Sequence, residues 1–189
     1  SHVFSNVIDP ESPYVEGDYG TAKGGHTVML TMAISKDYKH LVLLDTFFPN
    51  RMVEIDNAQR INERIYNKVR SQFPMASSTE MFCDQASPSM IATLRQNVWN
   101  VSEIIPCVKR NRELGIDEIS AVTLIQQYMM KGRLKILNTE ENVKRTKKAL
   151  IEATQDIKGY LIDNQSWEAD IVDALKYIFT SKFVLLVDN

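Results

Sequence analysis

The sequence predicts an α/β protein whose mixed sheet combines an antiparallel meander with parallel strands, with helices on both faces. Three apolar runs rich in β-branched and aromatic residues follow one another within residues 12–48. From residue 55 onward, short apolar runs alternate with segments of helical periodicity. Because strands that alternate with helices build sheets covered on both sides, this order predicts a three-layer arrangement.

The meander comprises the runs "SPYVEGD" (residues 12–18), "HTVMLTMAIS" (26–35) and "HLVLLDTFF" (40–48). The polar stretch "KDYK" forms the turn between the second and third strands. An amphipathic helix over residues 55–73 follows, with apolar residues at helical spacing and Pro74 as its terminator. This helix is expected to cross over the sheet.

The second half of the chain contains the remaining strands and helices. The strands are "TEMFCD" (79–84), "VSEIIPCV" (101–108) and the short edge strand "RLKIL" (133–137). After the first of these, Ser87 is expected as the N-cap of a helix with Pro88 at its first position. Further helices are predicted at residues 116–130, 140–157 and 167–182.

The length of 189 residues, 44% of them hydrophobic, suits one well-buried core. We therefore predict a single domain over residues 14–189. Residues 1–13 are expected to be a remnant of an expression tag and an incoming linker, because "DPESP" is a turn-rich stretch. No apolar run approaches the roughly 20 residues that span a bilayer, so no membrane association is expected.

The net charge of -2 argues against a protein that holds nucleic acid by bulk charge alone. Basic islands nevertheless occur at residues 108–112, 131–135 and 143–148, and an anionic partner remains possible. Cys83 and Cys107 lack metal-ligand or redox spacing and are expected to be buried, reduced thiols. The methionines at positions 29, 32, 129 and 130 are expected to fill the core.

Acidic residues occur at the ends of predicted strands, where the functional groups of α/β sheets are usually found. Asp18 and Asp84 each end a predicted strand, and strand ends are where α/β sheets bind ligands. Asp170 and Asp173 lie three residues apart in the last helix and therefore project side by side. Asp18 could instead be a turn former, and the helical pair could be an ordinary solvent-facing pair.

Clustered carboxylates suit hard divalent cations. Mg²⁺ or Mn²⁺ prefers carboxylate and water oxygens, and two such ions can activate a water and stabilise the leaving oxygen of a phosphodiester. In this hypothesis Asp18 bridges two ions, with Asp84 on one and Asp173 on the other. Asp170 joins a shell directly or through water, or acts as a local base. No Cys or His ligand set favours zinc.

The motifs "DYGT", "FCDQAS" and "DIVDALKY", in this order, resemble the C-terminal nuclease domain of the large terminase subunit of tailed double-stranded DNA phages. The resemblance runs from Tyr14 to Tyr177 and implies a ribonuclease H-like fold. It also implies that Asp18, Asp84 and Asp173 form the metal-binding triad of an endonuclease that cuts concatemeric viral DNA during genome packaging, with little sequence preference. The "DALKY" pentapeptide is its most specific element.

The same resemblance implies partners and a location. Complete large terminases carry an N-terminal ATPase motor, and this chain contains no phosphate-binding loop motif. Double-stranded DNA, the motor domain, the portal and the small terminase subunit are therefore the expected partners, in the host cytoplasm. Candidate DNA-binding residues are Lys23, Lys109, Arg110 and Arg112, which could neutralise phosphates.

Two other classes of protein remain open from the sequence. One is another ribonuclease H-like nuclease, such as a junction resolvase or a transposase-type enzyme, whose acids would be arranged similarly. The other is a non-catalytic DNA- or protein-binding module in which the acids are structural.

Overall fold

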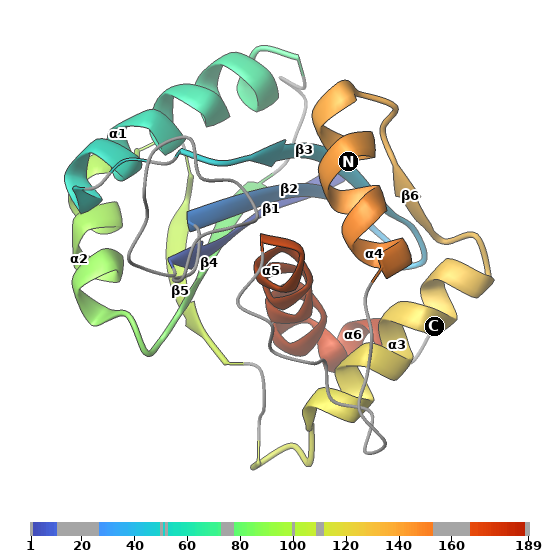
Figure 1. Ribbon diagram of the computed structural model, residues 1–189. Coiled ribbons are helices and arrows are strands. Elements are labelled where there is room, and N and C mark those ends of the chain that lie inside the picture. Colours follow the sequence, from blue (N-terminus) through green and yellow to red (C-terminus); the bar gives the residue numbers. More distant parts are fainter. Residues whose placement is uncertain are drawn as a thin grey trace.

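A six-stranded mixed sheet forms the centre of the protein (Figure 1). The computed structural model describes residues 2–10, 27–49, 51, 53–72, 78–99, 101–108, 112–152 and 167–187. The strands are β1 (His2–Pro10), β2 (Thr27–Ser35), β3 (Leu41–Phe47), β4 (Ser78–Asp84), β5 (Glu103–Cys107) and β6 (Leu134–Ile136). They lie side by side in the order β5-β4-β1-β2-β3-β6.

The sheet combines an antiparallel meander with parallel strands, as the sequence predicts. β1, β2 and β3 pair antiparallel. β4 pairs parallel to β1, β5 pairs parallel to β4, and β6 pairs parallel to β3. The carboxyl ends of β1, β4 and β5 therefore meet at one edge of the sheet.

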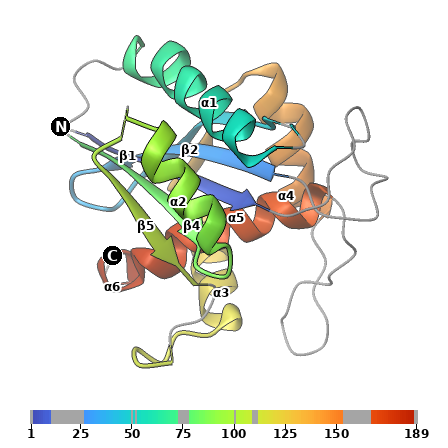
Figure 2. The same ribbon diagram turned by 90° about the vertical axis from the view of Figure 1, so that its left-hand side faces the viewer.

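Helices cover both faces of the sheet (Figures 1 and 2). One face carries α1 (Glu54–Arg64), which continues as the π-helical segment η1 (Ile65–Arg70), and α2 (Pro88–Asn97). The other face carries α3 (Glu118–Met130), the π-helical segment η2 (Asn142–Lys147), α4 (Lys148–Glu152), α5 (Trp167–Ser181) and α6 (Phe183–Val187). In the described part of the chain, no helix is long and apolar enough to cross a membrane.

The continuous apolar run of β2 serves both faces at once. Val28, Leu30 and Met32 belong to the core cluster beneath α5, while Met29 and Ala33 belong to the cluster beneath α1 and α2. Alternation along the strand sends successive side chains to opposite sides. A strand buried on both faces therefore needs apolar residues at nearly every position.

The predicted elements within the described residues are confirmed, with boundaries shifted by a few residues. Ser87 takes the N-cap position of α2, although its side chain makes no capping hydrogen bond. The two cysteines are free and buried, as expected. The short helix α6 was not predicted, because its apolar pentapeptide "FVLLV" has no helical periodicity of its own.

Two predictions need correction. The expected linker is wrong for residues 2–10, because His2–Pro10 form β1 in the middle of the sheet. The predicted first strand at residues 12–18 lies outside the described residues. Met129 and Met130 are not core residues, since they are 42% and 87% exposed, whereas Met29 and Met32 are buried.

Candidate metal centre

Asp84 occupies the last position of β4, at the edge where the parallel strands end. Its Oδ1 accepts a hydrogen bond of 2.9 Å from the backbone N–H of Ala86, which fixes the carboxylate in the turn towards α2. Phe82, two residues earlier, belongs to the core cluster beneath α5. Because side chains two apart share a face of a strand, Asp84 lies on the face that α5 covers.

The direction of α5 brings its acidic residues to the same edge. The Nζ of Lys182, just after α5, lies 2.8 Å from Oε2 of Glu80, near the start of β4. From there α5 runs back antiparallel to β4, and its C-terminal end leads into α6 on the side of the sheet where β1 begins (Figure 2).

This ion pair sets the relative position of the two elements. Asp84 lies four residues beyond Glu80, which is about 13 Å along a strand. The same distance along a helix is about nine residues, and nine residues before Lys182 is Asp173. A helix that ran straight along β4 from this ion pair would bring Asp173 near the level of Asp84, and Asp170 about one turn nearer the N-terminus of α5.

Burial and charge differ between the two helical acids. Asp170 is 5% exposed. The Asp173 side chain is 18% exposed, and its Oδ1 lies 3.3 Å from Nζ of Lys176, whose side chain is almost fully buried. A lysine ammonium is stable in such a place only when a carboxylate compensates its charge. Asp173 is thus held by an internal cation, so the pair on α5 is not an ordinary solvent-facing one.

Asp9 is a strand-end acid that the sequence analysis missed. Ile8 of β1 pairs with Cys83 of β4, so Asp9 is level with Asp84 on the adjacent parallel strand. Across the other edge of β1, Asp9 pairs with Val28, a residue of the core beneath α5. Register thus assigns position 9 to the same edge and face as Asp84.

A signal for Asp9 was present in the sequence. "VFSNVID" is an apolar run that an aspartate ends, which is the same pattern that drew attention to Asp84. The following Pro10 made the segment resemble a turn, although proline is tolerated at the end of a strand.

The other predicted site residues are placed as follows. Asp18, Lys23, Lys109 and Arg110 lie outside the described residues. Arg112 is exposed in the turn before α3. Among the described residues, no group of three His, Cys, Asp or Glu side chains is close enough to hold a metal ion.

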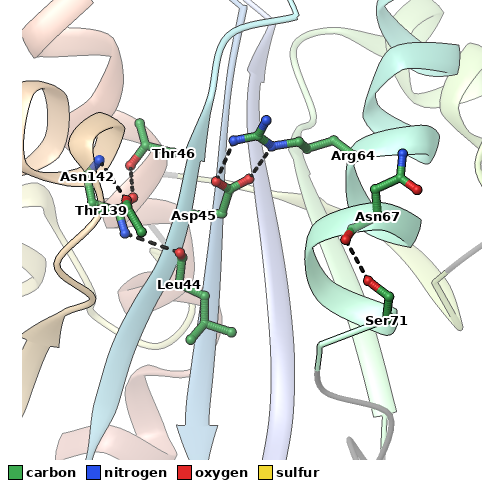
Figure 3. A network of polar contacts seen from close by, with 8 residues as sticks. All are labelled: Leu44, Asp45, Thr46, Arg64, Asn67, Ser71, Thr139 and Asn142. Atoms are coloured by element: carbon green, nitrogen blue, oxygen red, sulfur yellow. Dashed lines mark hydrogen bonds and ion pairs between the residues drawn. The ribbon is translucent and has the colours of Figure 1, made fainter.

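One further acid near the end of a strand is excluded from this cluster by a β-bulge. The pairing of β2 with β3 shifts register between Thr31 and Met32, which leaves Leu44 unpaired. As a result Asp45 faces α1 rather than α5, and Arg64 donates two hydrogen bonds to its carboxylate, at 2.7 and 2.8 Å (Figure 3). These bonds raise the pKa of Arg64 above its ordinary value. Asp45 is therefore committed to a structural ion pair.

The next residue, Thr46, faces the opposite side and joins a buried polar network with η2 (Figure 3). Its hydroxyl donates to Oδ1 of Asn142 at 2.8 Å and lies 2.7 Å from the hydroxyl of Thr146. The Asn142 amide donates to the carbonyl oxygens of Leu44 at 3.2 Å and Leu137 at 3.0 Å. This network fixes η2 to the end of β3.

Asp9 and Asp84 stand at the ends of two parallel strands, and Asp170 and Asp173 stand on α5, a helix that covers one face of the sheet. Carboxylate oxygens are the donors that Mg²⁺ and Mn²⁺ prefer, whereas zinc sites are typically built with Cys or His. The mixed sheet, with its antiparallel meander, parallel strands and covering helices, is the ribonuclease H-like fold.

Comparison with solved structures shows which proteins share this fold. The chain is similar to the nuclease domain of P22 large terminase, with a TM-score of 0.62 and 12% identity over 99% of this chain and 86% of that one. It is similar to the large terminase nuclease domain of bacteriophage SPP1 with bound Mn, with a TM-score of 0.57 and 11% identity over 95% and 86%. The Mn-soaked human cytomegalovirus terminase nuclease domain gives 0.59 and 13% over 97% and 85%.

No protein-family model matches the sequence, and no curated protein matches it. The expected resemblance to terminase nuclease domains is thus confirmed as a likeness of fold.

Proposed function

We propose that the protein is a metal-dependent endonuclease acting on double-stranded DNA. The observation that carries this proposal is the ribonuclease H-like sheet with Asp84 at the end of β4 and Asp9 level with it on the neighbouring parallel strand. The fold is shared with terminase nuclease domains, two of which hold or were soaked with Mn. The carboxylate donor set supports the same class of ion.

The residues proposed to hold the ions are Asp9, Asp84 and Asp173, with Asp170 in an outer position or as a local base. Two Mg²⁺ or Mn²⁺ ions in such a site would activate a water and stabilise the leaving oxygen of a phosphodiester. Asp18 remains a predicted ligand, and Asp9 is the alternative that the register of β1 favours. The protein's own contribution is to keep the acids together at the ends of rigid elements.

DNA would be held through its phosphates, and sequence preference would be low. Lys23, Lys109, Arg110 and Arg112 are the proposed contacts, and the exposed Arg112 is available to a phosphate. By analogy with the large terminases that share the fold, the wider role would be cutting concatemeric viral DNA during genome packaging in the host cytoplasm. An ATPase motor domain, the portal and the small terminase subunit would be the protein partners.

The proposal is tested by cleavage of supercoiled plasmid with Mn²⁺, Mg²⁺ or EDTA. We expect nicking and linearisation that EDTA abolishes and that Asp84→Asn and Asp173→Asn reduce at least a hundredfold, because each removes a charged oxygen ligand. The control is Asp56→Asn, an exposed acid in the first turn of α1, which covers the face of the sheet opposite to α5. Undiminished cutting by either site variant, or intact plasmid with both ions, would contradict the proposal.

The same assay separates the two candidates for the first acid. Asp9→Asn should abolish cleavage if Asp9 is the ligand, and Asp18→Asn should then leave it within a few-fold of the parent chain. The reverse result would assign the role to Asp18.

A further inference from the structure

An apolar groove lies between α3 and α4, over the edge strand β6. Its volume is about 530 Å³. The apolar lining comes from the end of α3, from β6, and from η2 and α4: Met129, Leu134, Ile136, Val143, Leu150 and Ile151. Asn138 and Lys147 supply polar groups at its border.

Several of these apolar side chains are exposed to solvent. Ile151 is 72% exposed, Met129 is 42% exposed and Val143 is 37% exposed. Met130, next to the groove, is 87% exposed. Scattered apolar residues are ordinary on a protein surface, but a contiguous concave group of them marks an interaction site. Met129 suits such a site because its flexible side chain adapts to a partner.

The segment that forms the groove is strongly basic. Residues 129–151 contain seven Lys or Arg and two Glu, a net charge of +5, in a chain whose net charge is -2. Lys144 pairs with Glu140 on the exposed side of η2. Within the described part of the chain, no carboxylate pairs with Lys131 or Lys147. The groove therefore joins an apolar floor to Lys147 at its border, within a basic segment of the chain.

We propose that this groove binds an amphipathic helix of a partner protein, with apolar residues on one face and acidic residues beside them. The apolar floor matches side chains at the i, i+3, i+4 and i+7 positions of a helix. Lys147 at the border of the groove, in a basic segment, matches carboxylates beside that apolar face. Bare DNA is a poor occupant, because phosphates and sugars would leave the apolar floor without a matching surface.

The geometry of the fold also favours a helix. α3 and α4 lie on the same face of the sheet and flank β6, so a helix placed between them would extend the helical layer over the edge of the sheet (Figure 1). This inference rests on the groove alone and is independent of the proposed nuclease activity.

The test uses a synthetic fluorescent peptide of about 18 residues, or five helical turns. Leucines occupy one face at i, i+3, i+4 and i+7 spacing, and glutamates flank them. One counterpart carries lysine for each glutamate, and a second carries glutamine for each leucine. Fluorescence anisotropy should show binding of the acidic peptide that is at least tenfold tighter than binding of either counterpart and that weakens with salt.

Substitutions locate the binding. Ile151→Asp and Lys147→Glu should each weaken binding of the acidic peptide at least tenfold, with melting temperatures close to that of the parent chain, because both side chains are exposed. The matched control is Val184→Asp, which places the same charge on an exposed apolar site of α6, 53% exposed and outside the groove. It should bind the peptide like the parent chain.

Three results would overturn the proposal. One is equal binding of the acidic and lysine peptides, and another is unchanged binding by Ile151→Asp and Lys147→Glu. The third is displacement of the bound peptide by a short DNA duplex with no effect of the leucine-to-glutamine change, which would identify the surface as one for nucleic acid.

Discussion

The buried Lys176 is the residue that most affects the acids around it. Its ammonium lies 3.3 Å from Oδ1 of Asp173 and is almost fully screened from solvent. A cation at this place offsets the repulsion between neighbouring carboxylates on α5. In the proposed metal site the same cation would repel a divalent ion at that oxygen, so Lys176 would stabilise the metal-free protein and weaken the binding of metal.

Replacing Lys176 by methionine tests whether the lysine stabilises the metal-free protein and weakens metal binding. Lys176→Met should lower the free energy of unfolding by about 2–3 kcal/mol without metal, since it leaves a partly buried carboxylate without its cation. The same change should tighten Mn²⁺ binding about tenfold or more, because the repulsion between cations is removed. Urea unfolding and titration calorimetry measure the two effects.

A matched control exists at the other end of α5. Lys182→Met removes the cation that pairs with Glu80, about 13 Å along the sheet from the acids. It should lower stability without changing Mn²⁺ affinity. Weaker Mn²⁺ binding by Lys176→Met would mean that the lysine orients Asp173 for the metal instead of competing with it.

Single residues also show how far the sequence predicts the site. Asp84, Asp170 and Asp173 could be selected because strand ends and helical spacing are visible in one dimension. The position of Asp9 depends on register with a strand some 75 residues later, which no local pattern reveals. The role of Asp45 depends on the bulge at Leu44. One unpaired residue in a strand turns the side chains of the residues after it to the opposite face of the sheet.

Among the elements, β3 is fixed by polar contacts on both faces: Asp45 binds Arg64 on one side, and Thr46 binds η2 on the other. Asn142 is fully buried and holds η2 to β3 through Thr46 and Leu44, and to the residue after β6 through Leu137. Such a network stabilises only while every member is satisfied.

Asn142→Ala should therefore lower the free energy of unfolding by about 2–4 kcal/mol, because it leaves buried carbonyl and hydroxyl groups unpaired. Asn138→Ala, at an exposed position four residues earlier, should change it by less than about 0.5 kcal/mol. Urea denaturation compares the two. Equal losses in the free energy of unfolding would show that the hydrogen bonds of Asn142 contribute no more to stability than the exposed side chain of Asn138.

Tyr128 joins α3 to two other segments. Its hydroxyl lies 2.7 Å from the carbonyl oxygen of Tyr38, in the turn between β2 and β3, and 3.0 Å from that of Leu186 in α6. Burial raises the pKa of Tyr128 above its ordinary value of 10.0. The unfolded chain therefore ionises at lower pH than the folded protein, so the stability that Tyr128 contributes is complete below pH 10 and is lost as pH rises further.

Tyr128→Phe should lower the free energy of unfolding by about 1 kcal/mol at pH 7, where the hydroxyl is neutral in both states. The difference between parent and variant should narrow above about pH 10, because only the parent loses stability through this group. Urea unfolding at pH 7, 9 and 10.5 measures the trend. A difference that widens with pH would contradict the stated direction of the pKa shift.

The order of the strands and helices was largely predictable from the sequence, because strand and helix segments differ in the spacing of their apolar residues. β6, for example, could be recognised as a short edge strand. The division of the 140–157 helix into η2 and α4 was not visible, because it follows from the polar contacts with β3.

At the scale of the whole molecule, the proposed site draws acids from the start, middle and end of the chain. An ion that binds only this assembled set must stabilise the entire fold by mass action, by about 2.7 kcal/mol at a hundredfold excess over its Kd. Millimolar Mn²⁺ should therefore raise the melting temperature of the parent chain by several degrees.

The shift should shrink in Asp84→Asn and Asp173→Asn, and in whichever of Asp9→Asn and Asp18→Asn removes the first ligand. Calcium-free buffer with EDTA gives the baseline for differential scanning fluorimetry, and Asp56→Asn is again the control. An unchanged melting temperature in Mn²⁺ would show that the acids do not form a common metal site.

The central place of β1 has a consequence for how the molecule assembles. β1 is synthesised first, yet its partners in the sheet are β2 and β4, and β4 ends only at Asp84. Until that residue has left the ribosome, one side of β1 is an unpaired edge that can join a strand of another chain. We expect the closure of β4 onto β1, over a loop of some 70 residues, to be a slow step, because loop-closure entropy is lost before the distant strands gain contacts. That closure brings Asp84 level with Asp9, so a chain that misfolds at this step would lack the proposed metal site.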